Sequence, residues 1–123
     1  MAESHDFGER AEEFAAEFLV SKGYCLLHRN WTYGHKELDI VCTDGRLLII
    51  VEVKARKQGS FPHPEDLLSP AKERFIIEAA EHYLYQYAVC MPVRFDLVSV
   101  IAHGSLFDIE HLEDAIIPGV EKI

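Results

Sequence analysis

Apolar residues recur at helical spacing in two segments of the chain. The first segment runs from Phe7 to Leu19 and is followed by Gly23, so the pattern predicts a helix over residues 8–22. The second follows Ser69 and Pro70, a pair suited to the N-cap and the first helical position. A second helix is therefore expected over residues 70–87.

Strand-like runs separate these two helices and follow the second one. Residues 37–43 and 46–53 flank the dipeptide Asp44-Gly45, a strong short-range signal for a β-hairpin. Further strands are expected at 24–31, 93–101 and, as an edge, 106–110. Residues 55–68, rich in Gly, Pro, Ser and charge, are expected to form a loop with a helical turn at 65–68.

The resulting order of elements is α-β-β-β-α-β. This order predicts an α/β fold in which a mixed central β-sheet is flanked by helices. The chain has 123 residues, of which 49% are hydrophobic, and no repeat or linker divides it. We therefore expect one domain over residues 1–123 with a single organised core.

Residue parity within the predicted hairpin brings charged side chains together. If Asp44 and Gly45 form a two-residue loop, Thr43 pairs with Arg46 and Asp39 pairs with Ile50. Alternation then places Glu37, Asp39, Glu52 and Lys54 on one face, with Asp39 and Glu52 as diagonal neighbours about 7–8 Å apart. Two carboxylates at this spacing can bind a hard divalent cation between them.

Glu52 stands at the end of a strand that reads as buried on both sides. Leu47 to Val51 is an uninterrupted apolar run, and an uncompensated carboxylate beside it would cost several kcal/mol. Glu52 therefore requires a cationic partner. Lys54 on the same face can supply it in a purely structural ion pair or as part of a metal site, and the spacing alone leaves both interpretations open.

Charge and apolar run length bear on location and partners. The net charge of −9 argues against a nucleic-acid-binding surface, but residues 22–74 hold nine Lys and Arg against seven Asp and Glu. This middle segment is the part of the chain suited to a polyanion. The acidic N-terminus and the absence of a long apolar run predict a soluble, cytoplasmic protein.

Cysteine and histidine are expected to have no chemical role. Cys25, Cys42 and Cys90 form no C-x-x-C pair and are expected to be small buried hydrophobic residues. The seven histidines lack a metal-binding spacing, and we expect them on the surface or in loops.

Several stretches of the chain together resemble a known family. They are GERAEEFAAEFLVSKGY, RNWTYGHKELDIV, DGRLLIIVEVKAR, SPAKERF and PVRFDLVSV, spanning residues 8–100. In this order they resemble the YraN-like family of small bacterial proteins. That family is placed with the PD-(D/E)XK nuclease superfamily and is similar to archaeal Holliday-junction resolvases.

The resemblance implies a restriction-endonuclease-like core and a metal-dependent endonuclease site. Asp39 and Glu52 would bind Mg²⁺ or Mn²⁺ together with the backbone carbonyl of Val53, and Lys54 would orient the attacking water. The resolvases also carry a helical glutamate four residues after a glycine, which corresponds to Glu12. One departure is that Leu38, and not proline, precedes Asp39.

Helix phase supports the choice of Glu12. Of the glutamates at positions 9, 12, 13 and 17, Glu12 points closest to the apolar stripe of the first predicted helix. A role as a solvated surface glutamate remains the alternative for Glu12.

The implied substrate is nucleic acid, DNA more than RNA, and branched DNA among its forms. Lys36, Arg56, Lys57, Lys72 and Arg74 are candidates for contacts to backbone phosphates. Paired cleavage of a junction would need a homodimer, for which the stripe Phe75, Tyr83 and Tyr87 is a candidate interface beside its alternative, core packing. Two rival functions are a catalytically silent nucleic-acid-binding module and an interaction protein with a buried ion network.

Overall fold

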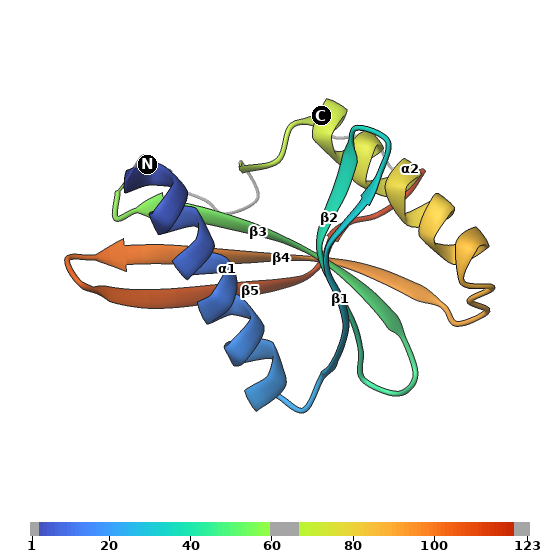
Figure 1. Ribbon diagram of the computed structural model, residues 1–123, viewed down its shortest axis with the longest axis horizontal. Helices are drawn as coiled ribbons and strands as arrows, with labels where there is room; N and C mark the ends of the chain where they lie inside the picture. Colours follow the sequence, from blue (N-terminus) through green and yellow to red (C-terminus); the bar gives the residue numbers. More distant parts are fainter. Residues whose placement is uncertain (1–2, 60–66, 120–123) are drawn as a thin grey trace.

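A five-stranded mixed sheet with two helices forms the structure, a computed structural model that describes residues 3–59 and 67–119 (Figure 1). The elements in chain order are α1 (Glu3–Ser21), β1 (Cys25–Tyr33), β2 (Lys36–Thr43), β3 (Leu48–Lys57), α2 (Pro70–Gln86), β4 (Val93–His103) and β5 (Leu106–Ile116). This arrangement confirms the predicted fold class and is compatible with a restriction-endonuclease-like core.

The strands follow one another across the sheet in the order β1-β2-β3-β4-β5. All neighbouring pairs are antiparallel except β3 and β4, which are parallel. A parallel pair needs a crossover connection, and α2 supplies it. The N-cap prediction for α2 is confirmed, because the Ser69 side chain accepts a hydrogen bond of 3.1 Å from the backbone N–H of Lys72.

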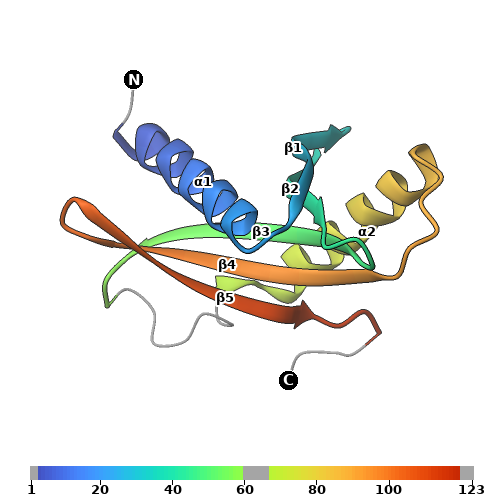
Figure 2. The same cartoon turned by 90° about the horizontal axis from the view of Figure 1, so that it is seen from below.

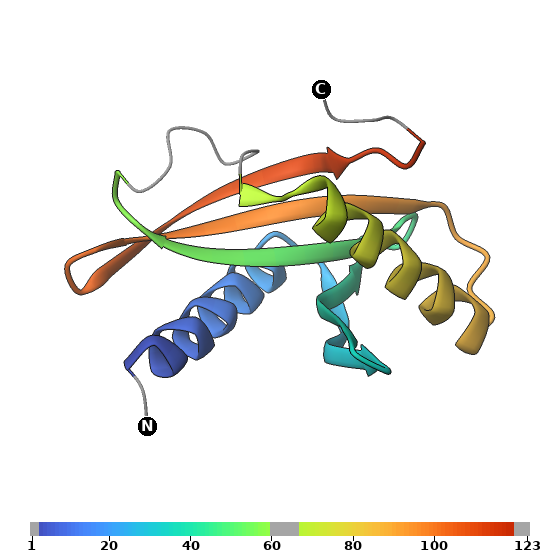
Figure 3. The same cartoon turned by 90° about the horizontal axis from the view of Figure 1, so that it is seen from above.

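Two apolar clusters cover the two faces of the sheet. One cluster joins α2 to β2, β3 and β4 through residues such as Ile50, Ile76 and Leu97. The other joins α1 to the opposite face of the same strands through Leu19, Val51 and others. Figures 2 and 3 show α1 and α2 lying toward opposite ends of the long strands. As predicted, β3 is therefore buried on both sides.

The predicted register of the β2–β3 hairpin is wrong by two residues. Thr43 pairs with Leu48, and Ile40 pairs with Val51, so the loop has four residues and not two. The Asp44 side chain closes this loop by accepting hydrogen bonds from the backbone N–H groups of Arg46 and Leu47. A shift of two residues preserves parity, so the predicted face is retained while Asp39 moves from Ile50 toward Glu52.

The ladder between β2 and β3 is short and ends beside Asp39. Only residues 40–43 of β2 pair with residues 48–51 of β3. Beyond these pairs, β1 and β2 turn away from the plane of the three long strands (Figure 2). Strands β2 and β3 therefore separate at Asp39 and Glu52. We refer to this point of separation below as the β2–β3 fork.

Several other boundaries differ from the predictions. Helix α1 starts at Glu3 and β3 continues to Lys57, so the region expected as a loop from residue 55 begins later. Strand β5 extends to Ile116, well beyond the predicted 106–110, because it pairs with β4 along most of its length. Half of the expected loop, residues 60–66, lies outside the described residues, and so does the first half of its expected helical turn at 65–68; Leu67, in the second half, has 3₁₀-helical geometry.

Two expectations about single residue types are also corrected. Cys42 is buried as predicted, but Cys25 and Cys90 are exposed, since they lie at the start of β1 and after α2. His111 is not a surface residue: its side chain is 5% exposed and lies against Asp96. Neither helix of the described chain is long and apolar enough to cross a membrane.

Candidate functional site

Asp39 and Glu52 meet at the β2–β3 fork. Beyond the last ladder pair, Oδ2 of Asp39 accepts a hydrogen bond of 2.9 Å from the backbone N–H of Val53. The Asp39 side chain thus bonds to β3 where the backbone ladder has ended. This bond holds its carboxylate beside that of Glu52, and the predicted pair is brought together.

Glu52 is a buried carboxylate in an unfavourable setting for its charge. The residue is 5% exposed. Burial, together with the negative charge of Asp39, raises the pKa of Glu52 to about 8. Burial also raises the pKa of Asp39, although the N–H of Val53 opposes the rise. Two acids with raised pKa values in contact are typical of sites that bind a cation or exchange protons.

Two lysines from different elements approach the same oxygen of Glu52. Nζ of Lys54 on β3 lies 3.8 Å from Oε2 of Glu52, and Nζ of Lys72 on α2 lies 3.7 Å from it. Both separations exceed the roughly 2.7–2.9 Å of a charge-assisted hydrogen bond. The lysines therefore act on Glu52 mainly through their charge. Both lysine side chains remain about one-third exposed.

Glu12 approaches the fork from α1. It is half-buried, whereas Glu9, Glu13 and Glu17 are exposed, in agreement with the helix phase. Burial raises the pKa of Glu12, and the charges of Asp39 and Glu37 add to the rise. Glu12 therefore belongs to the same electrostatic group as Asp39. Arg29 acts in the opposite direction and lowers the pKa of Glu12.

The oxygen atoms at the fork are of the type that a hard divalent cation prefers, but the side chains alone do not complete its coordination. Asp39 and Glu52 supply carboxylate oxygens, which Mg²⁺ and Mn²⁺ prefer. A cation between them would also relieve the repulsion that raises the pKa of Glu52. Within residues 3–59 and 67–119, no three His, Cys, Asp or Glu side chains converge closely enough to hold a metal ion by themselves. Backbone or water oxygens would have to complete the coordination.

The five predicted phosphate contacts have different surroundings. Lys57 and Arg74 are exposed, and Nζ of Lys36 lies 3.4 Å from the Glu78 carboxylate. Arg56 is buried and donates to Oγ of Ser99 at 3.0 Å and to Oε1 of Glu110 at 2.9 Å. We therefore do not retain Arg56 as a phosphate contact, because its guanidinium group is already hydrogen-bonded to side chains of β4 and β5.

The sequence pattern did not reveal Lys72 as a neighbour of Glu52. The prediction placed Lys72 among phosphate contacts, since a helical lysine twenty residues from Glu52 carries no register that relates the two. The sequence did indicate that Lys72 lies in the first turn of α2, because it follows the N-cap Ser69 by three residues. The docking of α2 on β3 decides the contact.

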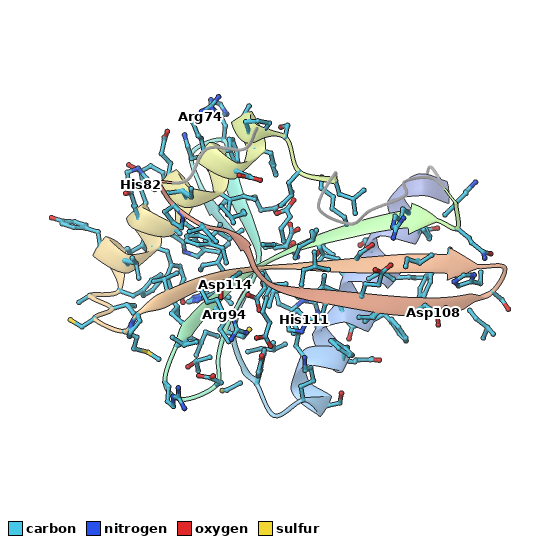
Figure 4. All side chains as sticks on the ribbon, turned by 180° about the vertical axis from the view of Figure 1, so that it is seen from behind. Arg74, His82, Arg94, Asp108, His111 and Asp114 are labelled. Carbon is cyan, nitrogen blue, oxygen red and sulfur yellow. The ribbon has the colours of Figure 1, made fainter. Side chains whose placement is uncertain are left out.

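A second polar network was also missed. Arg94 donates two hydrogen bonds of 2.8 Å to the buried Asp96, and His111 lies 2.8 Å from the same carboxylate. Arg94 and His111 are labelled in Figure 4. Nζ of Lys22 lies 2.8 Å from Nδ1 of His111, so Nε2 carries the proton that Asp96 accepts. Although burial raises it, the hydrogen bonds from His111 and Arg94 hold the pKa of Asp96 below its usual value.

This network joins β4, β5 and the C-terminal end of α1. It lies on the α1 face of the sheet, whereas the Glu52 side chain faces α2, and its polar groups bond to one another. The position of Arg94 and Asp96 two residues apart in a mostly apolar strand was the sequence signal for a buried pair. We assign it a structural role.

Comparison with known proteins gives a consistent result across nearly the whole chain. Residues 11–100 match the model of the family described as "Uncharacterised protein family UPF0102". A UPF0102 protein of Phocaeicola vulgatus is 45% identical over 98% of this chain and 99% of its own length. One of Porphyromonas gingivalis is 44% identical over 94% of this chain and 87% of its own. One of Flavobacterium psychrophilum is 39% identical over 94% and 97%.

Proposed function

The chain belongs to the family UPF0102, and from that premise we propose that it is a metal-dependent endonuclease that hydrolyses phosphodiester bonds in nucleic acid. One observation carries the proposal. The acid pair of half-buried Asp39 and buried Glu52 stands at the β2–β3 fork, with Lys54 and Lys72 at 3.8 and 3.7 Å from Glu52. Hydrolysis of a phosphodiester requires carboxylates that bind a metal cation and positively charged groups that bind the phosphate anion, and both kinds of group are present here. DNA is the favoured substrate.

The proposed cofactor is Mg²⁺ or Mn²⁺. Asp39, Glu52 and the backbone carbonyl of Val53 would bind it, with Glu12 acting through water or a second ion. The metal, when bound, lowers the pKa of a coordinated water and neutralises charge on the phosphate. The raised pKa of Glu52 supports this role, because a carboxylate that is costly to ionise alone is stabilised as the anion by a divalent cation.

The lysines have separate roles in the proposal. Lys54 shares β3 with Glu52 and orients the attacking water. Lys72 reaches the same carboxylate from α2 and binds an oxygen of the scissile phosphate. Neighbouring phosphates are contacted by Lys36, Lys57 and Arg74. These contacts recognise the nucleic-acid backbone, so binding does not depend on base sequence.

A catalytically silent module is the alternative, and one observation favours it. Lys54 and Lys72 already place two positive charges beside Glu52, so the acid pair has compensation without a metal. An ion network of this kind can persist for structural reasons alone. The same fold would then bind nucleic acid or a protein without cutting.

Cleavage assays separate these functions. Purified protein would be incubated with single-stranded, duplex and four-way-junction DNA in Mg²⁺ or Mn²⁺, beside Asp39→Asn, Lys54→Ala and the exposed control Glu17→Gln. We expect metal-dependent cleavage that both site variants lose, by at least about a hundredfold, and the control retains. Binding without cleavage would support the silent module. Neither binding nor cleavage would refute both nucleic-acid functions.

Oligomeric state bears on the substrate. Paired cuts in a four-way junction need two active sites, and hence a homodimer. Tyr83 of the candidate interface is 2% exposed and packs in the core, so it is not part of any such surface. Sedimentation with and without junction DNA would show whether two copies assemble on it.

A further inference from the structure

An open hollow lies between the end of β1 and the last turns of α2. Its volume is about 640 Å³. It is lined by Tyr33, Glu81, His82, Tyr85 and Gln86. Figure 4 shows His82 on α2, apart from the Arg94–His111 network. The polar network and the β2–β3 fork contribute none of its lining residues, so the hollow is a separate feature of the surface.

Aromatic rings build this hollow and hold its shape. Tyr33 and His82 stack with ring centroids 3.8 Å apart and planes 15° apart. The Trp31 ring lies nearly parallel to Tyr33, at 13° and 6.5 Å. These contacts join the end of β1 to α2 before any ligand arrives. The side of the hollow formed by Tyr33 and His82 is therefore preorganised, which lowers the entropic cost of binding a flat ligand.

Two of the rings remain open to solvent. Tyr33 is 45% exposed and Tyr85 is 90% exposed. Tyr85 packs against no other aromatic ring among the described residues. Tyr85 therefore offers an uncovered ring face beside the Tyr33–His82 stack, where an aromatic ligand can stack.

We propose that this hollow binds an unpaired base of a polynucleotide strand. The inference rests on the proposed function and names its substrate class. The lining includes the carboxylate of Glu81 and neither Lys nor Arg, so it repels a phosphate and suits a neutral planar group. The Gln86 amide and the Glu81 carboxylate supply hydrogen-bonding groups for a base edge. In a duplex the faces of each base are covered by its neighbours, so only an unpaired base can enter.

A path of basic and aromatic groups connects the hollow to the β2–β3 fork. Lys72 stands in the first turn of α2 and Tyr85 in the last, about 20 Å apart at roughly 1.5 Å per residue. At the fork end of this path, Nζ of Lys72 and of Lys36 lie 4.8 and 5.4 Å from the centre of the Phe75 ring, and Nζ of Lys36 also lies 3.4 Å from the Glu78 carboxylate. A strand laid along α2 would place phosphates on these lysines and a base in the hollow. This is the pattern of single-strand-binding surfaces.

The test measures binding without cleavage. Fluorescence anisotropy in EDTA would compare a single-stranded oligodeoxynucleotide of about twelve nucleotides, its duplex, and the same strand made of abasic residues. Tyr85→Ala should weaken single-strand binding about tenfold, which is about 1.4 kcal/mol, and leave abasic binding unchanged, because the lost ring stacks on a base. Tyr85→Phe keeps the ring and should match wild type. Leu106→Ala, 72% exposed at the β4–β5 turn, controls for lost apolar surface.

The other outcomes either overturn the inference or separate it from the proposed nuclease function. Equal weakening on normal and abasic strands would overturn the inference, as would wild-type protein that fails to bind single strands. In the second case, metal-dependent duplex cleavage would still support the proposed function. Base-dependent binding without cleavage under any condition would support the hollow as a base-binding site and refute the proposed nuclease function. If Tyr85→Ala instead dissociates a dimer in sedimentation and leaves base-dependent binding intact, the hollow is a contact between copies and the inference fails.

Discussion

The raised pKa of Glu52 predicts that removing its charge stabilises the protein. Burial and Asp39 raise this pKa from 4.5 to about 8 in the folded state. The folded protein therefore holds a proton that the unfolded chain releases across this range. The contribution of Glu52 to stability is full below pH 4.5 and is lost as the pH rises through about 8. Without metal, wild-type protein should become less stable over this interval.

The magnitude follows from the two pKa values. At roughly 1.4 kcal/mol per pKa unit, the rise from 4.5 to about 8 corresponds to a ceiling of about 5 kcal/mol. The pKa of about 8 already includes the attraction of Lys54 and Lys72, so Glu52→Gln removes the cost with no further deduction for these pairs. At about pH 8, where half of the folded molecules are ionised at Glu52, the expected gain is at most about 4 kcal/mol, a large fraction of a typical domain's stability of about 5–15 kcal/mol.

Denaturant titrations would measure this gain. The free energy of unfolding from urea curves at about pH 5 and about pH 8, in EDTA, would be compared for wild type, Glu52→Gln and the exposed control Glu17→Gln. Wild type and the control should lose stability relative to Glu52→Gln as the pH rises. The reasoning is refuted if Glu52→Gln is less stable than wild type at about pH 8, or if its advantage does not grow with pH.

Three further predictions concern the metal, the buried network and the cap of α2. Mn²⁺ at about pH 8 should raise the melting temperature of wild type and leave Asp39→Asn unchanged in calorimetry, because the cation relieves the Asp39–Glu52 repulsion; equal shifts in both would contradict the site. Asp96→Asn should cost about 3 kcal/mol in urea unfolding, since it breaks the buried pair with Arg94; a loss below about 1 kcal/mol would show that the network is dispensable. Ser69→Ala should cost about 1 kcal/mol, against no loss in Ser69→Asp, which can also cap α2.

The local elements of this protein are set by its sequence. The spacing of apolar residues and the pair Ser69-Pro70 place both helices, because amphipathic periodicity and capping act within a few residues. Alternation along β2 and β3 likewise puts Asp39, Glu52 and Lys54 on one face. The register error of two residues left this face unchanged, since side chains repeat with a period of two. Asp44 caused the error by closing a longer loop with its side chain.

Contacts between distant segments needed the tertiary structure. The approach of Lys72 to Glu52, the burial of Arg56 against Glu110, and the bond from His111 to Asp96 all join elements far apart in the chain. The stacking of Tyr33 on His82 does the same for the hollow. None follows from local periodicity, because each depends on how α2 and β5 dock on the sheet. Sequence thus determined which face carries the acids, and packing determined which cations and rings stand beside them.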